Sequence, residues 1–156
     1  MLLVLGYGNT LCRDDGFAFS VIAYLRNAIA DMSSVEIICE QQLLPEHAER
    51  LSQSSLAIFV DASCSHDRGA IDCIELEQDR DSAFAACQTA LPHSLSPSKL
   101  LAMAAHIYGS APPAYLYTVG AVSLELGEGL SPTVEKAVPR VGEMILTRIK
   151  SSCKTS

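Results

Sequence analysis

The sequence has few basic residues and no long apolar run. Lys and Arg number 11 against 18 Asp and Glu, which gives a formal net charge of −7. Binding to nucleic-acid phosphates requires a basic face, so this balance argues against a nucleic-acid partner. The longest apolar runs, residues 1–5 and 56–60, are far shorter than the ~20 residues of a membrane-spanning helix. We therefore expect no nucleic-acid partner and no membrane association.

The cysteine spacing lacks the usual metal and redox motifs. The chain has six cysteines, but no two are separated by only two residues, which excludes zinc-ribbon and thioredoxin-like motifs. The first residues are apolar and carry no preceding positive charge, unlike an export signal. We therefore expect a cytoplasmic protein with free thiols.

The composition and patterning predict one α/β domain. Of the 156 residues, 49% are hydrophobic and 19% are charged, which excludes wholesale disorder. Strands are expected at residues 2–5, 35–39, 56–60, 70–76 and 114–119, the fourth weakly patterned and near an edge. Helices are expected at residues 17–30, 45–51, 97–108 and from 132 to 149. Such alternation predicts a largely parallel sheet covered on both faces, in a single domain over 1–156 with a loose tail at 150–156.

Chemistry-bearing residues follow two of the expected strands. In open parallel sheets, sites form at the carboxyl ends of strands. Asp14 and Asp15 follow the first strand after a glycine-containing loop, and Asp61 follows the third strand. His93 lies in a loop because Pro92 keeps the chain before it extended. If the first and third strands are neighbours, two carboxylates and the histidine can converge at one sheet edge. Such a set suits nickel or zinc better than magnesium, and three protein ligands leave positions open for a substrate.

The same residues also permit plainer interpretations. Asp14 and Asp15 precede a helix and could cap it, and Asp61 could serve a turn. A lone loop histidine is usually solvated. The run Gly6-Tyr7-Gly8 resembles the beginning of a dinucleotide fingerprint, but Leu11 occupies the position of its third glycine.

Four segments, in order, resemble the motifs of the hydrogenase maturation proteases. These endopeptidases trim the large subunit of nickel-iron hydrogenases. The segments are VLGYGNTL followed by DDG in residues 4–16, FVDA at 59–62, HSL followed by Pro97 and two leucines in 93–101, and GEGLSPTV at 127–134. They span nearly the whole chain, and their common order makes the resemblance specific.

The resemblance implies a fold and a set of reacting residues. The implied fold is a three-layer α/β/α sandwich of the phosphorylase/hydrolase-like type. Its twisted sheet has five mostly parallel strands in the order 2-1-3-5-4, with strand 4 antiparallel. The catalytic and metal-contacting positions of the family fall on Asp15, Asp61 and His93. The first of these positions is often Glu, so Asp15 gives a shorter reach.

The resemblance also implies where the substrate binds. Matching positions in the first motif are Gly8, Asn9 and Asp14. Many members have a glycine-rich turn after the second strand, where this chain has Gln41 and Gln42. We expect these two residues to help select the substrate.

The implied activity is that of an aspartyl or metal-dependent endopeptidase, monomeric and cytoplasmic. Its partner would be a hydrogenase large-subunit precursor, whose C-terminal extension is removed after nickel insertion. Nickel would arrive with the substrate and be weakly held or absent in the free protein. The ion could act as a docking marker and Lewis acid, or one carboxylate could act as general base, and the sequence leaves both open. A non-catalytic nickel or subunit chaperone is one alternative. A receiver-like signalling domain is another, although no lysine follows the fifth strand.

Overall fold

The computed structural model describes residues 1–31, 33–64, 67–77 and 95–154. Its strands form one five-stranded sheet in the order β2-β1-β3-β5-β4. The strands are β1 (Leu2–Tyr7), β2 (Val35–Glu40), β3 (Leu56–Ser63), β4 (Ile71–Leu76) and β5 (Ala114–Gly120). Neighbouring strands are parallel except β4, which runs antiparallel to β5 at the edge. The expected strand order and the antiparallel fourth strand are therefore confirmed.

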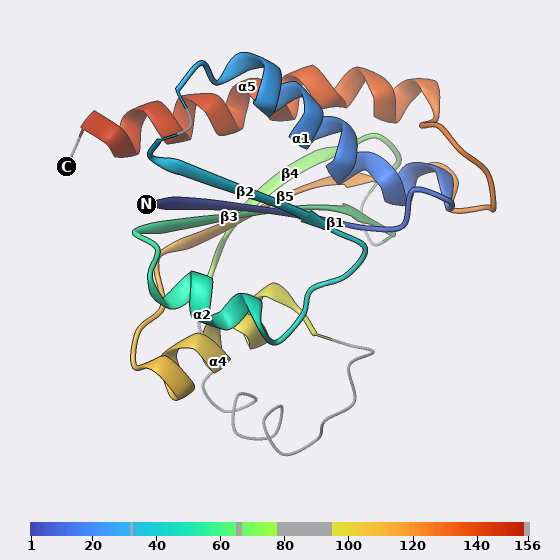
Figure 1. Ribbon diagram of the computed structural model, residues 1–156. Coiled ribbons are helices and arrows are strands. Elements are labelled where there is room, and N and C mark those ends of the chain that lie inside the picture. The colour runs from blue at the N-terminus through green and yellow to red at the C-terminus, as the bar shows by residue number, and fades with distance from the viewer. Residues whose placement is uncertain (32, 65–66, 78–94, 155–156) are drawn as a thin grey trace.

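Helices cover both faces of the sheet (Figure 1). The helices α1 (Phe17–Ala28) and α5 (Pro132–Lys154) pack on one face, and α2 (His47–Ser52) and α4 (Pro97–Tyr108) pack on the other. A short 3-10 helix, η1 (Arg13–Gly16), precedes α1. This arrangement confirms the three-layer α/β/α sandwich. Within the described ranges, no helix is both long and apolar enough to cross a membrane.

Alternation along the strands decides which side chains meet at the sheet edge. Leu5 of β1 and Phe59 of β3 pack toward α2 and α4, whereas Val60 packs toward α1 and α5. Successive strand residues point to opposite faces, so the α2 and α4 side continues with Tyr7 and Asp61. Tyr7 packs against the cluster of buried residues on this side. The apolar pattern of β1 and β3 thus positions two polar groups beside each other.

The helix α4 covers the range expected for it, residues 97–108, and has capping residues at both ends. The Ser96 hydroxyl accepts a hydrogen bond from the Lys99 N–H at 3.2 Å, and Pro97 occupies the first turn. Gly109 ends the helix in a left-handed conformation. Leu95, just before this helix, packs against the buried cluster that Tyr7 contacts.

The last helix, α5, is longer than predicted. We expected residues 150–156 to be loose, but α5 continues to Lys154. Ile149 is buried against the sheet, and this anchor allows the helix to continue for another turn. Pro139 lies inside α5, and the helix continues on both sides of it.

Candidate functional site

Asp61 lies at the carboxyl end of β3, next to the end of β1. The β1–β3 register pairs Gly6 with Val60, which places Tyr7 beside Asp61. The Tyr7 hydroxyl donates a hydrogen bond to the Asp61 carboxylate. The N–H of Ala62 donates a second hydrogen bond to Asp61 Oδ1 at 2.7 Å. Asp61 is therefore fixed by one strand-end hydroxyl and one backbone donor.

The surroundings of Asp61 favour its protonated form. Burial raises the pKa of Asp61 to about 7, although the hydrogen bonds from Ala62 and Tyr7 act to lower it. The negative charge of Asp15 raises it further. Burial also raises the pKa of Tyr7, and the charges of Asp61 and Asp15 add to this shift. Near neutral pH, Asp61 is therefore able both to give and to take a proton.

Asp15 reaches the same edge from η1. The N–H of Asn9 donates to Asp15 Oδ2 at 2.7 Å, and the Asn9 side-chain oxygen accepts from the Leu11 N–H at 3.0 Å. Gly8, with φ of 151°, packs against the same turn, and a Cβ atom there would lie 1.9 Å from the Asp15 carbonyl oxygen. Only glycine fits this close approach. Gly16 is the N-cap residue of α1 and makes no side-chain capping bond.

Asp14 makes its contacts with the chain itself. Its carboxylate is fully buried and accepts hydrogen bonds from the N–H groups of Val122, Ser123 and Ser131 and from the Ser131 hydroxyl, at 2.7–2.9 Å. Burial acts to raise the pKa of Asp14, but these hydrogen bonds outweigh it and lower the pKa below the ordinary value. We expected Asp14 to bind substrate, and in this structure it ties the loop after β5 to η1 instead.

The other predicted site residues lie in different surroundings. Gln41 and Gln42 are exposed in the turn after β2. His93 lies outside the described residues, so its expected contact with Asp15 and Asp61, which we call the acid pair, stays a prediction. Within the described part of the chain, no group of three His, Cys, Asp or Glu residues is arranged to hold a metal ion.

Tyr7 is the site residue that the sequence analysis missed. A signal for it was present, because residues 3, 5 and 7 of β1 lie on one face of the sheet. On the neighbouring strand β3, the residues on the same face end at Asp61. A phenol at the end of an otherwise apolar strand face is well placed to hydrogen-bond such an acid.

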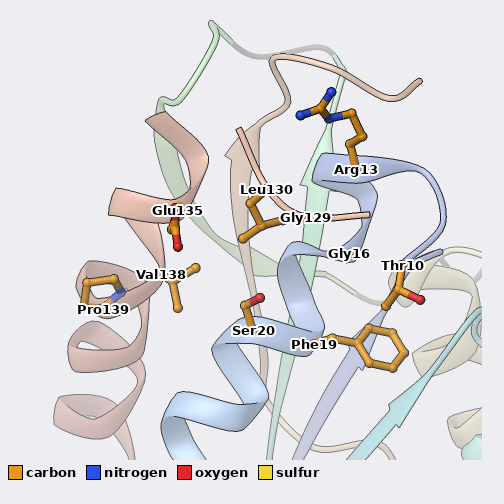
Figure 2. A pocket seen from close by; sticks show the side chains of 10 residues that line it. All are labelled: Thr10, Arg13, Gly16, Phe19, Ser20, Gly129, Leu130, Glu135, Val138 and Pro139. Atoms are coloured by element: carbon orange, nitrogen blue, oxygen red, sulfur yellow. The ribbon is translucent and has the colours of Figure 1, made fainter. Parts of the chain in front are cut away.

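A separate pocket of about 410 Å³ lies between the loop after β1, the beginning of α1 and the beginning of α5 (Figure 2). Thr10, Arg13 and Glu135 are among its lining residues, and the acid pair is not. The Arg13 Nε atom is buried and has no hydrogen-bond partner among the described residues. Arg13 also adopts a left-handed φ of 44°, which is uncommon for a residue other than glycine.

Comparisons with known proteins support the fold and the resemblance. No protein-family model matches the chain, and no curated protein matches it. The solved structure of the hydrogenase maturating endopeptidase HybD from E. coli superposes with a TM-score of 0.78 at 25% identity, covering 97% of this chain and 93% of that one. The solution structure of an endopeptidase from Escherichia coli gives a TM-score of 0.73 at 26% identity, with the same coverage. A hydrogenase 2 maturation peptidase from a Thaumarchaeota archaeon gives 0.67 at 25% identity, over 95% of this chain and 97% of that one.

Two of these three structures are of hydrogenase maturation peptidases, the family that the motifs indicated. The resemblance found in the sequence is therefore confirmed, and it supports a peptidase.

Proposed function

We propose that this protein, which has the fold and the motifs of the hydrogenase maturation endopeptidases, removes the C-terminal extension of a nickel-iron hydrogenase large-subunit precursor. It acts after nickel has been inserted and recognises the nickel that the precursor carries. We further propose that it works in the cytoplasm as a monomer. The observation that carries this proposal is the meeting of Asp15 and Asp61 at the carboxyl edge of the sheet.

The acid pair suits a cation that arrives from outside. The charges of two neighbouring carboxylates repel each other, and a divalent cation relieves this repulsion. The Asn9 N–H holds one oxygen of Asp15, and the Ala62 N–H and the Tyr7 hydroxyl hold the Asp61 carboxylate, so both acids are fixed in place to meet a cation. In the proposal, both acids and His93 contact the nickel of the precursor. An empty precursor offers no ion and is not selected.

Two chemical steps are compatible with this arrangement. In the first, the nickel of the precursor polarises the scissile carbonyl or a water molecule as a Lewis acid. In the second, Asp61 takes a proton from the attacking water as general base and passes it to the leaving amine. Tyr7 supports the second step because its hydrogen bond stabilises the ionised form of Asp61.

The test is the intact mass of a nickel-loaded large-subunit precursor after incubation with the protein. We expect loss of one C-terminal peptide with the unmodified protein and not with His93→Ala or Asp61→Asn. Nickel-free precursor should keep its mass. A matched control is Asp31→Asn, because Asp31 is exposed and lies in the turn before β2. It should cleave at the rate of the unmodified protein.

The outcomes separate the candidate functions. An unchanged precursor mass together with stable binding would replace the peptidase by a non-catalytic chaperone. Cleavage that persists in His93→Ala would keep the peptidase and remove His93 from the essential site. Equal cleavage of nickel-free precursor would remove nickel recognition from the proposal.

A further inference from the structure

Three large apolar side chains are exposed on the loops beside the acid pair. Leu11, in the loop after β1, is 54% exposed, and Leu124 and Leu126, in the loop after β5, are 41% and 87% exposed. We call these three residues the leucine rim. Single exposed leucines are common, but several on adjoining loops are typical of an interaction site.

Hydrogen bonds hold the two loops of the leucine rim together. The Gly127 N–H donates to the Leu11 carbonyl at 2.8 Å, and the Arg13 N–H donates to the Gly127 carbonyl at 2.9 Å. The buried Asp14 carboxylate adds bonds to Ser123 and to other residues of the second loop. The exposed leucines are thus presented from a fixed backbone, which lowers the entropy cost of binding a partner.

The leucine rim is continuous with the acid pair. Asn9 joins them, because its N–H donates to the Asp15 carboxylate while its side-chain oxygen accepts from the Leu11 N–H. A bound peptide that contacts Leu11 is therefore separated from Asp15 by Asn9 alone, which hydrogen-bonds both residues. This position fits a substrate that has to present a particular bond to the acids.

The exposed charge of the rim is negative. The stretch 124–129 contains two leucines of the rim, two glycines and the acidic residues Glu125 and Glu128, and all of it is exposed. The basic side chain beside it, Arg13, is half-buried, with its stem packed against Gly127 and its Nε buried, so the two exposed charges of the stretch are those of the glutamates. Such a surface complements apolar side chains flanked by a basic one.

We propose that the leucine rim docks an apolar stretch of the large-subunit precursor, flanked by a basic side chain, next to the bond that is cleaved. The identity of this partner rests on the proposed function. The contact with Leu126 supplies affinity for the precursor, while the acid pair acts on the bond.

The test compares Leu126→Ser and the double variant Leu11→Ser/Leu126→Ser with the unmodified protein, using nickel-loaded precursor. Full burial of a leucine corresponds to about a 10-fold to 100-fold change in affinity, so we expect KM to rise about tenfold for the single variant. The double variant should raise KM further, and kcat should change less than about twofold in both. The matched control is Ile107→Ser, because Ile107 is 53% exposed at the end of α4. It should leave KM unchanged, and all variants should keep the melting temperature.

An unchanged KM in the double variant would overturn the docking proposal even if cleavage proceeds. If the unmodified protein leaves the precursor mass unchanged, the proposed peptidase activity is wrong. The docking proposal is then tested separately by measuring the Kd for the precursor. A Kd for Leu126→Ser that is tenfold weaker than that of the unmodified protein supports docking on the leucine rim, and an equal Kd overturns it. A dimer that Leu126→Ser converts to monomer, with KM unchanged, would assign the rim to a second copy of the chain and overturn the precursor as its partner.

Discussion

Asp14 and Asp61 are two carboxylates near the same sheet edge, and the chain surrounds them in opposite ways. Asp14 ties the loop after β5 to η1 and accepts four hydrogen bonds, so its pKa falls despite full burial. Asp61 ends β3 and accepts two hydrogen bonds, but burial outweighs them and, together with the charge of Asp15, raises its pKa to about 7. The comparison separates a carboxylate that stabilises the fold from one that is free to react. The following predictions test this contrast from the largest expected change in free energy to the smallest.

The largest effect should come from removing the Asp14 carboxylate. Asp14→Ala leaves buried donors of the second loop without an acceptor, which typically costs about 3–5 kcal/mol of unfolding free energy. Urea denaturation at pH 7 measures this loss. Asp31→Ala is the control, because that exposed side chain accepts a single local hydrogen bond from Ser33.

Because the pKa of Asp14 is lower in the folded state, its stabilisation is present above the ordinary value of 3.8 and is lost as the pH falls below it. The difference between the unmodified protein and Asp14→Ala should therefore shrink in acid. A variant within 1 kcal/mol (about the worth of one ordinary hydrogen bond) of the unmodified protein at pH 7 would contradict the structural role of Asp14.

The next largest effect should come from filling the space at Gly8. Gly8→Ala places a methyl group against the Asp15 carbonyl oxygen, so the turn has to move, at a cost of about 2–3 kcal/mol. Thermal denaturation measures the loss. Gly109→Ala is a matched control, since Gly109 also has a left-handed φ but open space around its Cβ position. Equal losses in the two variants would argue that backbone strain alone, and not the approach to Asp15, restricts Gly8.

Asp61 should reverse the pH dependence seen for Asp14. Its folded pKa of about 7 lies above the ordinary 3.8, so the folded state keeps a proton that the unfolded state releases. Stability of the unmodified protein should fall as the pH rises through this window and then level off. Asp61→Asn lacks this penalty and should be more stable by about 2 kcal/mol at pH 8, with no gain at pH 3. Urea titrations at the two pH values check this, and a destabilised variant at pH 8 would refute it.

The smallest effect should come from the Tyr7 hydroxyl. Tyr7→Phe removes a hydrogen bond that favours ionised Asp61, so the pKa of Asp61 should rise by about one unit or less. The carboxyl carbon shift of Asp61, followed by NMR against pH, reports this directly. The control is Tyr108→Phe, on the exposed end of α4. A titration of Asp61 that moves downward in Tyr7→Phe would contradict the assigned hydrogen bond.

Local sequence patterns predicted most of the fold and part of the site. The apolar runs that end at Gly6 and Asp61 are strand signals, and the Ser96-Pro97 pair marked the beginning of α4 correctly. The different roles of Asp14 and Asp15 could not be predicted from the sequence, because the partners of Asp14 lie more than a hundred residues away along the chain. Adjacent residues with the same side chain differ here only through tertiary contacts.

Two other features were not predicted from the sequence, the place of Tyr7 in the site and the helical end of α5. The glycines on both sides of Tyr7 indicate a loop, although strand alternation continues through this residue. The end of α5 contains polar residues with no apolar stripe, so only its continuity with the buried Ile149 makes it helical.

The central claim is that the Asp61 carboxylate carries the reaction. The most direct test is the intact mass of nickel-loaded large-subunit precursor, incubated with the unmodified protein, Asp61→Asn and Asp31→Asn at equal folded concentration. Loss of a proton-transferring carboxylate slows such reactions by about 10²–10⁴-fold, so Asp61→Asn should leave the precursor uncut while the other two proteins release one C-terminal peptide. Cleavage by Asp61→Asn at the rate of the unmodified protein would contradict the account.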